Sequence, residues 1–365
     1  AKIGLSIDQM QCLNLRGRHI SCTHCADSCA ANALQLTADA IQLDTGRCTA
    51  CGACLPACPS GAITLGEFDP QQFLQSVAGI AELHIHCSRS EHSDVQNRVA
   101  CLQLLDARLL AAAAANGTHT VVLHGSHQCT SCVRGDAHAA IERMHSVIKK
   151  WFTHAPVQLL QAQSPQSETA QPQVQLDRRS FLRLATAQVT QDASAWIADK
   201  IPTSQAATPR WPLFEKDAIT YRPSAYQQLL AERAGSLPWR ERQFPWRSRI
   251  FSERCSGCLS CTQYCPTGAL TAHQTQTTVS IDFQLRLCTD CDLCIRLCPE
   301  NAIACSTTED AAELHAPARR VMQRSLRKCV SCAHSFVAGP SCAERCTTCQ
   351  NEYAIANDWK TMLTD

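Results

Sequence analysis

Aromatic residues and long hydrophobic runs are both scarce in this sequence. Aromatic residues make up 5% of the chain, and the apolar run LLAAAAA at 109–115 is far shorter than the roughly 20 residues of a transmembrane helix. We therefore expect no membrane span, and small cores that depend on bound metal for part of their stability. The opening residues, AKIGLSIDQMQ, lack a basic start followed by an apolar stretch, so we expect no signal peptide and a cytoplasmic location.

The sequence signatures of common redox enzymes are missing as well. There is no Gly-rich dinucleotide fingerprint and no flavin or pterin signature. Their absence favours a protein without a substrate of its own over a complete oxidoreductase. Cysteine, in contrast, is abundant, with 26 among 365 residues. In a reducing compartment these thiols are expected to bind metal rather than to form disulfides.

The net charge of the apo chain is close to neutral, at +1. Metal binding changes it, because an oxidised [4Fe–4S] core held by four thiolates adds about −2. With about five or six metal sites the loaded protein carries roughly −10. This charge argues against nucleic-acid binding, despite the Arg-rich run WRERQFPWRSR at 239–249.

The cysteines fall into four blocks, with a cysteine-free stretch between the second and the third. Part of that stretch, LLQAQSPQSETAQPQVQLD, is rich in Gln, Ser and Pro and predicts a linker. It continues into RRSFLRL, which we interpret as the start of a docking helix rather than an export signal. We expect five regions: an N-terminal module, an α/β domain, the linker with its docking helix, a C-terminal module and a tail, with bounds at 1–68, 80–160, 161–250, 251–306 and 307–365.

The third block contains a complete motif twice, CSGCLSCTQYCP and CTDCDLCIRLCP. This tandem C-x2-C-x2-C-x3-C-P pattern resembles the bacterial two-cluster ferredoxin, a small α+β fold. The resemblance implies that the fourth cysteine of each motif binds the other motif's [4Fe–4S] cluster. It gives a Cys255 set (Cys255, Cys258, Cys261, Cys298) and a Cys288 set (Cys265, Cys288, Cys291, Cys294). Cys305 lies outside the pattern and is expected to be a free thiol.

The first block has one complete motif, CTACGACLPACP, and one half, CTHCADSCA, with only three cysteines. The same crossing arrangement gives a full Cys48 set (Cys29, Cys48, Cys51, Cys54) and leaves Cys22, Cys25 and Cys58 one ligand short. Cys12 is the nearby candidate, since loop closure over nine residues costs little. It completes a Cys12 set (Cys12, Cys22, Cys25, Cys58), as in ferredoxin-like domains with an extended first loop. The alternative is a three-cysteine [3Fe–4S] site or a water-ligated iron. Ala30 stands where proline usually follows the crossing cysteine.

The second block predicts alternating strands and helices, and therefore a parallel sheet. Strands are expected at AELHIHC, RVAC, HTVVLHG and PVQLL, and helices at 104–117 and 137–152. The pattern resembles the delta-type subunit of hydrogenases that partner heterodisulfide reductase. The resemblance implies one [2Fe–2S] cluster on a Cys87 set (Cys87, Cys101, Cys129, Cys132), placed where parallel strands end. A structural zinc ion is the alternative, and His86 and His127 are not expected to be ligands.

The fourth block, CVSCAHSFVAGPSCAERCTTC, pairs two C-x2-C segments across a ribbon-length gap. This spacing is typical of a zinc ribbon and predicts a Cys329 set (Cys329, Cys332, Cys346, Cys349) for one zinc ion. Cys342 is a fifth cysteine in this block, so an iron–sulfur site is the alternative to zinc.

Taken together, the sequence predicts α+β ferredoxin modules, a small α/β parallel-sheet domain and a C-terminal zinc-ribbon-like knuckle. Four [4Fe–4S] clusters, one [2Fe–2S] cluster and one zinc ion are expected. We expect an electron-transfer subunit of a hetero-complex that relays electrons between a low-potential dehydrogenase or hydrogenase and a reductase, and that is not an enzyme by itself. The alternative is an accessory factor that delivers clusters or sulfur to a larger oxidoreductase.

Overall fold

The computed structural model describes residues 4–17, 22–37, 40–90, 97–162, 223–308, 311–337 and 344–364. These residues include all predicted ligands. The expected docking helix at RRSFLRL, most of the linker and the surplus Cys342 lie outside the described residues. Within the described ranges, no helix combines the length and the apolar character needed to cross a membrane.

The N-terminal module pairs its first and last strands, which brings its two half-motifs together. Strands β1 and β4 are antiparallel, with Leu5 opposite Leu65 and Ile7 opposite Ile63. Between them a second hairpin, β2–β3, and short helices carry the cysteines. The elements are β1 Leu5–Ile7, α1 Leu13–Gly17, α2 His24–Asp27, β2 Leu34–Leu36, β3 Ile41–Leu43, α3 Cys54–Ala57 and β4 Ile63–Leu65.

The α/β domain confirms the predicted parallel sheet. Its four strands follow the order β6-β5-β7-β8, and every neighbouring pair is parallel. The helix α5 begins where Asp106 accepts a hydrogen bond from the Leu109 amide at 3.1 Å, a side-chain N-cap. The elements are α4 Pro70–Ser76, β5 Glu82–Cys87, β6 Arg98–Val99, η1 Leu102–Leu104, α5 Ala107–Ala115, β7 Thr120–His124, η2 Ser126–Ser131, α6 His138–Trp151 and β8 Gln158–Gln161.

The segment before the C-terminal module packs on the α/β domain. Helix α8 (Ala225–Arg233) lies against α5, and its Tyr226 hydroxyl donates to the Leu104 carbonyl at 2.7 Å. After the short turn η4 (Ala234–Ser236), Trp239 packs on Phe152 with ring centroids 4.6 Å apart, and Trp246 is fully buried. Aromatic residues of this region, although few, thus hold this segment on the α/β domain.

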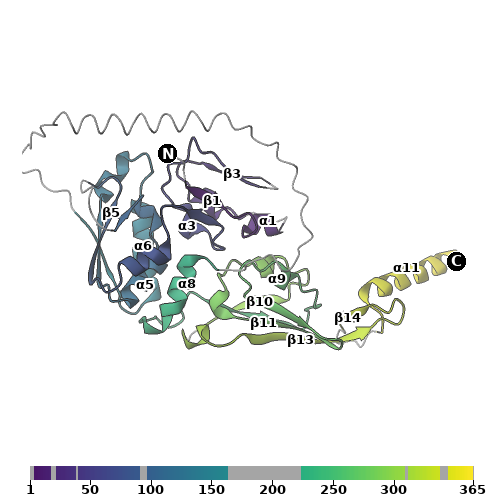
Figure 1. Ribbon diagram of the computed structural model, residues 1–365. Helices are drawn as coiled ribbons and strands as arrows, with labels where there is room; N and C mark the ends of the chain where they lie inside the picture. The colour runs from purple at the N-terminus through teal and green to yellow at the C-terminus, as the bar shows by residue number, and fades with distance from the viewer. Residues whose placement is uncertain are drawn as a thin grey trace, which may run out of the picture. The chain divides into compact units, whose positions relative to one another are not determined.

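The C-terminal module repeats the strand pairing of the first, with β9 (Arg247–Phe251) antiparallel to β12 (Ile303–Thr307). Strand β9 therefore begins inside the predicted linker. A second, four-stranded sheet has the order β10-β11-β13-β14 (Figure 1). The other elements are α9 Ser260–Gln263, β10 Leu270–Gln274, β11 Thr278–Phe283, η5 Leu285–Leu287, α10 Leu293–Arg296 and η6 Ala311–Leu314.

The tail predicted from residue 307 onward is partly built into the C-terminal module. Strand β13 (Arg319–Lys328) pairs along β11, with a register shift at Ile281/Asp282. Its sequence, RRVMQRSLRK, has little alternation of apolar and polar residues, so the sequence did not predict a strand here. Met322 is the one buried side chain of this strand. Strand β14 (Ser335–Val337) and helix α11 (Thr347–Thr364) follow. The predicted ligands of the fourth block lie in the turn between β13 and β14 and at the start of α11.

Candidate metal centres

The structure brings the four thiols of the Cys12 set together. Burial raises the pKa of Cys12, and the neighbouring thiols of Cys58 and Cys22 add to this shift. Burial also raises the pKa of Cys25 to about 12, with further contributions from Cys58, Cys22 and Cys12. Helix α2, which carries Cys25, also packs on α3, which leads into Cys58. The geometry therefore fits a site with Cys12 as the fourth thiol.

Asn14 closes the extended first loop, a role that the sequence did not indicate. Its side-chain oxygen accepts from the Cys22 amide at 2.6 Å, and its side-chain nitrogen donates to the Cys22 carbonyl at 2.8 Å. This two-point contact fixes both ends of the insertion beside each other. Two cysteines ten positions apart are therefore held near each other.

The Cys48 set lines one cavity, together with apolar residues such as Leu5, Leu34 and Leu43. The crossing cysteine Cys29 accepts a hydrogen bond from the Ala33 amide at 3.3 Å. Cys58 and Cys298 accept from Ala62 and Ala302 at the same distance. The same local turn forms after Cys29 although Ala30 replaces the usual proline, so this departure does not disturb the ligand position.

The two sets of the C-terminal module also gather as the resemblance implied. The thiols of the Cys288 set line one cavity. In the Cys255 set, burial raises the pKa of Cys261, and the thiols of Cys255, Cys258 and Cys298 contribute. Cys294 of the Cys288 set contributes as well, which places the two sets next to each other.

The Cys87 set lines a cavity at the carboxyl ends of β5 and β7, where a parallel sheet usually presents its ligands. Gly125, at φ +90, brings the backbone so close that a Cβ there would lie 2.5 Å from the Cys87 sulfur. Arg134 donates to the Ser88 hydroxyl and the Ala100 carbonyl and so ties together the loops that carry the ligands. His86 is buried and stacks on His124, and His127 is exposed.

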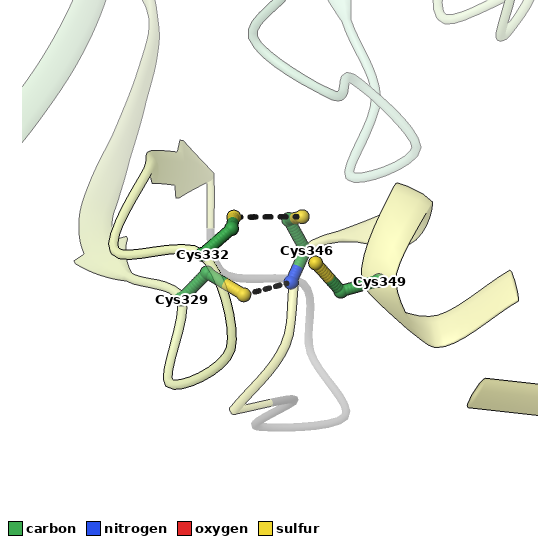
Figure 2. Close-up of side chains that lie close together, drawn as sticks. All are labelled: Cys329, Cys332, Cys346 and Cys349. Atoms are coloured by element: carbon green, nitrogen blue, oxygen red, sulfur yellow. Dashed lines mark hydrogen bonds between the residues drawn. The ribbon is translucent and has the colours of Figure 1, made fainter. Parts of the chain in front are cut away.

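The Cys329 set is much tighter than the others. Figure 2 shows its four side chains converging from the turn after β13 and from the start of α11. The four sulfurs all lie within 4.8 Å of one another, and those of Cys332 and Cys346 are 3.8 Å apart. The amide of Cys346 donates to the Cys329 sulfur at 3.3 Å, which lowers the pKa of Cys329 to about 6 and favours its thiolate. Such close sulfurs fit one metal ion, since Zn–S bonds of about 2.3 Å place tetrahedral sulfurs about 3.8 Å apart.

Comparisons with known proteins agree with the ferredoxin part of this description. Residues 254–302 match the 4Fe-4S dicluster domain family, and residues 41–64 match the 4Fe-4S binding domain family. The chain is also 44% identical over 46 residues to one subunit of an ion-translocating oxidoreductase complex from Methanosarcina acetivorans. That match covers 13% of this chain and 17% of the relative.

The chain thus contains two ferredoxin-type 4Fe-4S domains, as predicted. The match at 41–64 covers the complete motif of the first block and stops short of its three-cysteine half. The extended loop with Cys12 and the Cys87 and Cys329 sets lie outside both matched stretches. Iron–sulfur electron transfer is consistent with these domains.

Proposed function

We propose that this protein relays electrons through a continuous series of metal clusters. The observation that carries the proposal is the proximity of the cysteine sets across the module boundaries. Burial raises the pKa of Cys101 to about 11, and Cys51 of the N-terminal module adds to that shift. Burial raises the pKa of Cys22, and Arg296 of the C-terminal module counteracts this. The packing agrees at the first boundary, because a Cβ on Gly52 of the N-terminal module would overlap with the Leu104 side chain of η1, which follows Cys101.

These contacts define an order for the clusters. The Cys87 set adjoins the Cys48 set through Cys101 and Cys51, and the Cys48 set adjoins the Cys12 set through Cys54 and Cys25. Arg296 lies between Cys294 and Cys298 in sequence, so its proximity to Cys22 links the Cys12 set to the C-terminal module. The Cys255 and Cys288 sets then adjoin through Cys261 and Cys294. This arrangement supports transfer along a path from the α/β domain to the C-terminal module.

The clusters we propose are four [4Fe–4S] centres on the ferredoxin-type sets and one [2Fe–2S] centre on the Cys87 set. Four cysteine thiolates are the usual ligands of both cluster types, and each set supplies four. The assignment of the smaller cluster to the α/β domain rests on its resemblance to the delta-type hydrogenase subunit. We expect partners within an oxidoreductase hetero-complex: a low-potential dehydrogenase or hydrogenase at one end and a reductase at the other.

A relay and a cluster-delivery factor differ in what leaves the protein. The full chain, loaded and reduced with dithionite under anaerobic conditions, is mixed with oxidised partner enzyme recovered by co-purification. We expect its clusters to become reoxidised while its iron content stays constant, because only electrons pass. Transfer of iron and sulfide to apo-enzyme, without reoxidation of the clusters by the loaded enzyme, would instead establish the accessory function.

For the Cys329 set we propose a single zinc ion that holds β14 and α11 together. Replacing Cys332 with Ser in the full chain removes one of four thiolates, so we expect a loss of about one zinc per chain with the iron content unchanged. Metal analysis by mass spectrometry gives both values. Cys305→Ser is the matched control, because Cys305 belongs to none of the six sets, and it should keep the zinc. A fall in iron and sulfide in Cys332→Ser would show that the site holds an iron–sulfur cluster.

A further inference from the structure

Arg249 is a buried charge beside one of the proposed clusters. It lies on β9, and only 1% of its side chain is exposed. Burying a guanidinium costs free energy unless it is paired with opposite charge and hydrogen-bonded, so such partners are expected around Arg249. The identity of those partners shows what the side chain can do.

Two carboxylates and a thiol hold Arg249 in place. One terminal nitrogen donates to Asp290 at 2.9 Å and to Asp292 at 3.2 Å. The other donates to the Cys305 sulfur at 3.0 Å and to the Arg247 carbonyl at 3.2 Å. Cys305, which no cluster motif explains, is thus a hydrogen-bond partner of Arg249. These contacts leave the side chain little freedom.

The remaining donor of Arg249 faces no protein acceptor. Its Nε is fully buried and has no hydrogen-bond partner among the described residues. Arg249 also lines the cavity that the four thiols of the Cys288 set share. Burial raises the pKa of Cys294, and the positive charge of Arg249 opposes this. A donor that is buried without an acceptor is expensive, so an acceptor is expected in the cavity.

We infer that Arg249 sets the reduction potential of the cluster bound by the Cys288 set, by donating to cluster or ligand sulfur and placing a positive charge beside it. The inference rests on the proposed cluster at that set. Hydrogen bonds to the sulfurs and nearby positive charge favour the reduced cluster, which carries one more electron. Asp290 and Asp292 pair with the same guanidinium and hold it in place.

This inference gives the relay a direction. The Cys288 set adjoins the Cys255 set in the C-terminal module, which forms one end of the order described above. A raised potential at this end draws electrons toward it, and makes it the point from which an acceptor protein is reduced. Arg249 is therefore a positioning and tuning residue for electron exit.

The test is an EPR-monitored redox titration of the full-length protein carrying Arg249→Met. We expect one [4Fe–4S] step to move to lower potential by about 59 mV, a tenfold shift in the electron equilibrium, while the other steps stay in place. Arg249→Lys keeps the positive charge but loses the planar set of guanidinium N–H donors. Its potential should therefore fall by less than that of Arg249→Met. Arg247→Met is the matched control, because Arg247 bonds to the same Asp290 and Asp292 but does not line the cavity.

If Arg249→Met fails to retain its clusters because the carboxylates are left unpaired, the variant Arg249→Met/Asp290→Asn/Asp292→Asn removes those charges and is titrated instead. Unchanged potentials in a variant with full iron content would overturn the inference. So would an equal shift in Arg247→Met. The cluster itself is tested separately: Cys291→Ala leaves three thiols, so it should lose about one iron and give a [3Fe–4S] EPR signal. Full iron content with no new signal would overturn the proposed site rather than the role of Arg249.

Discussion

Replacing Cys12 with Ala should convert one [4Fe–4S] cluster into a [3Fe–4S] cluster. The three remaining thiols of the Cys12 set hold three corners of a cubane, and the iron without a thiolate is the one most readily lost. We expect a loss of about one iron per chain and a new EPR signal in the oxidised protein, where intact [4Fe–4S]²⁺ clusters give none. The effect is large because one residue supplies a quarter of the protein ligands of that cluster.

Two further variants make this result specific. Cys305→Ser removes a thiol that belongs to no set but keeps an acceptor for Arg249, and should leave the iron content and the EPR spectrum of the oxidised protein unchanged. Asn14→Ala keeps Cys12 but removes both hydrogen bonds that close the loop, so it should weaken the same cluster on prolonged exposure to air. A Cys12→Ala protein with full iron and no new signal would show that another group ligates the fourth iron.

Replacing Gly125 with Ala should remove the cluster of the α/β domain and leave the four cubanes in place. The new Cβ would lie 2.5 Å from the Cys87 sulfur and 3.2 Å from the Ser90 amide nitrogen. Both the ligand and the backbone beside it would have to move, and cluster ligation tolerates little displacement. We expect a loss of about two irons and of the [2Fe–2S] absorption and EPR features.

Gly117 provides a matched control for the backbone cost. Its φ is +100, close to that of Gly125, but a Cβ at this position meets nothing within 4 Å. Gly117→Ala should therefore lower stability by about 1–2 kcal/mol through its left-handed backbone alone, and keep all iron. Full iron content in Gly125→Ala, or equal losses of iron in both variants, would contradict the role assigned to Gly125.

The sequence was most informative where ligands are close along the chain. The C-x2-C-x2-C-x3-C-P motifs indicate ferredoxin-type domains because three ligands of each cubane come from one short turn, so their spacing is dictated locally. The parallel sheet was equally readable, since strands and helices alternate with clear periodicity from residue 82 to residue 161. The sequence does not predict strand β13, because its charged residues show almost no apolar alternation. The strand forms because β11 offers backbone hydrogen-bonding groups along its edge.

The amino-acid sequence alone therefore establishes the kind of chemistry and most of the candidate ligands. The folded arrangement of the chain selects which groups meet across long stretches of sequence: Arg249 on the cavity of the Cys288 set, Cys51 near Cys101, and Arg296 near Cys22. No periodicity or motif connects these pairs. They depend on packing, such as that of α8 on α5 and of Trp239 on Phe152, in which many weak contacts select one arrangement of the modules.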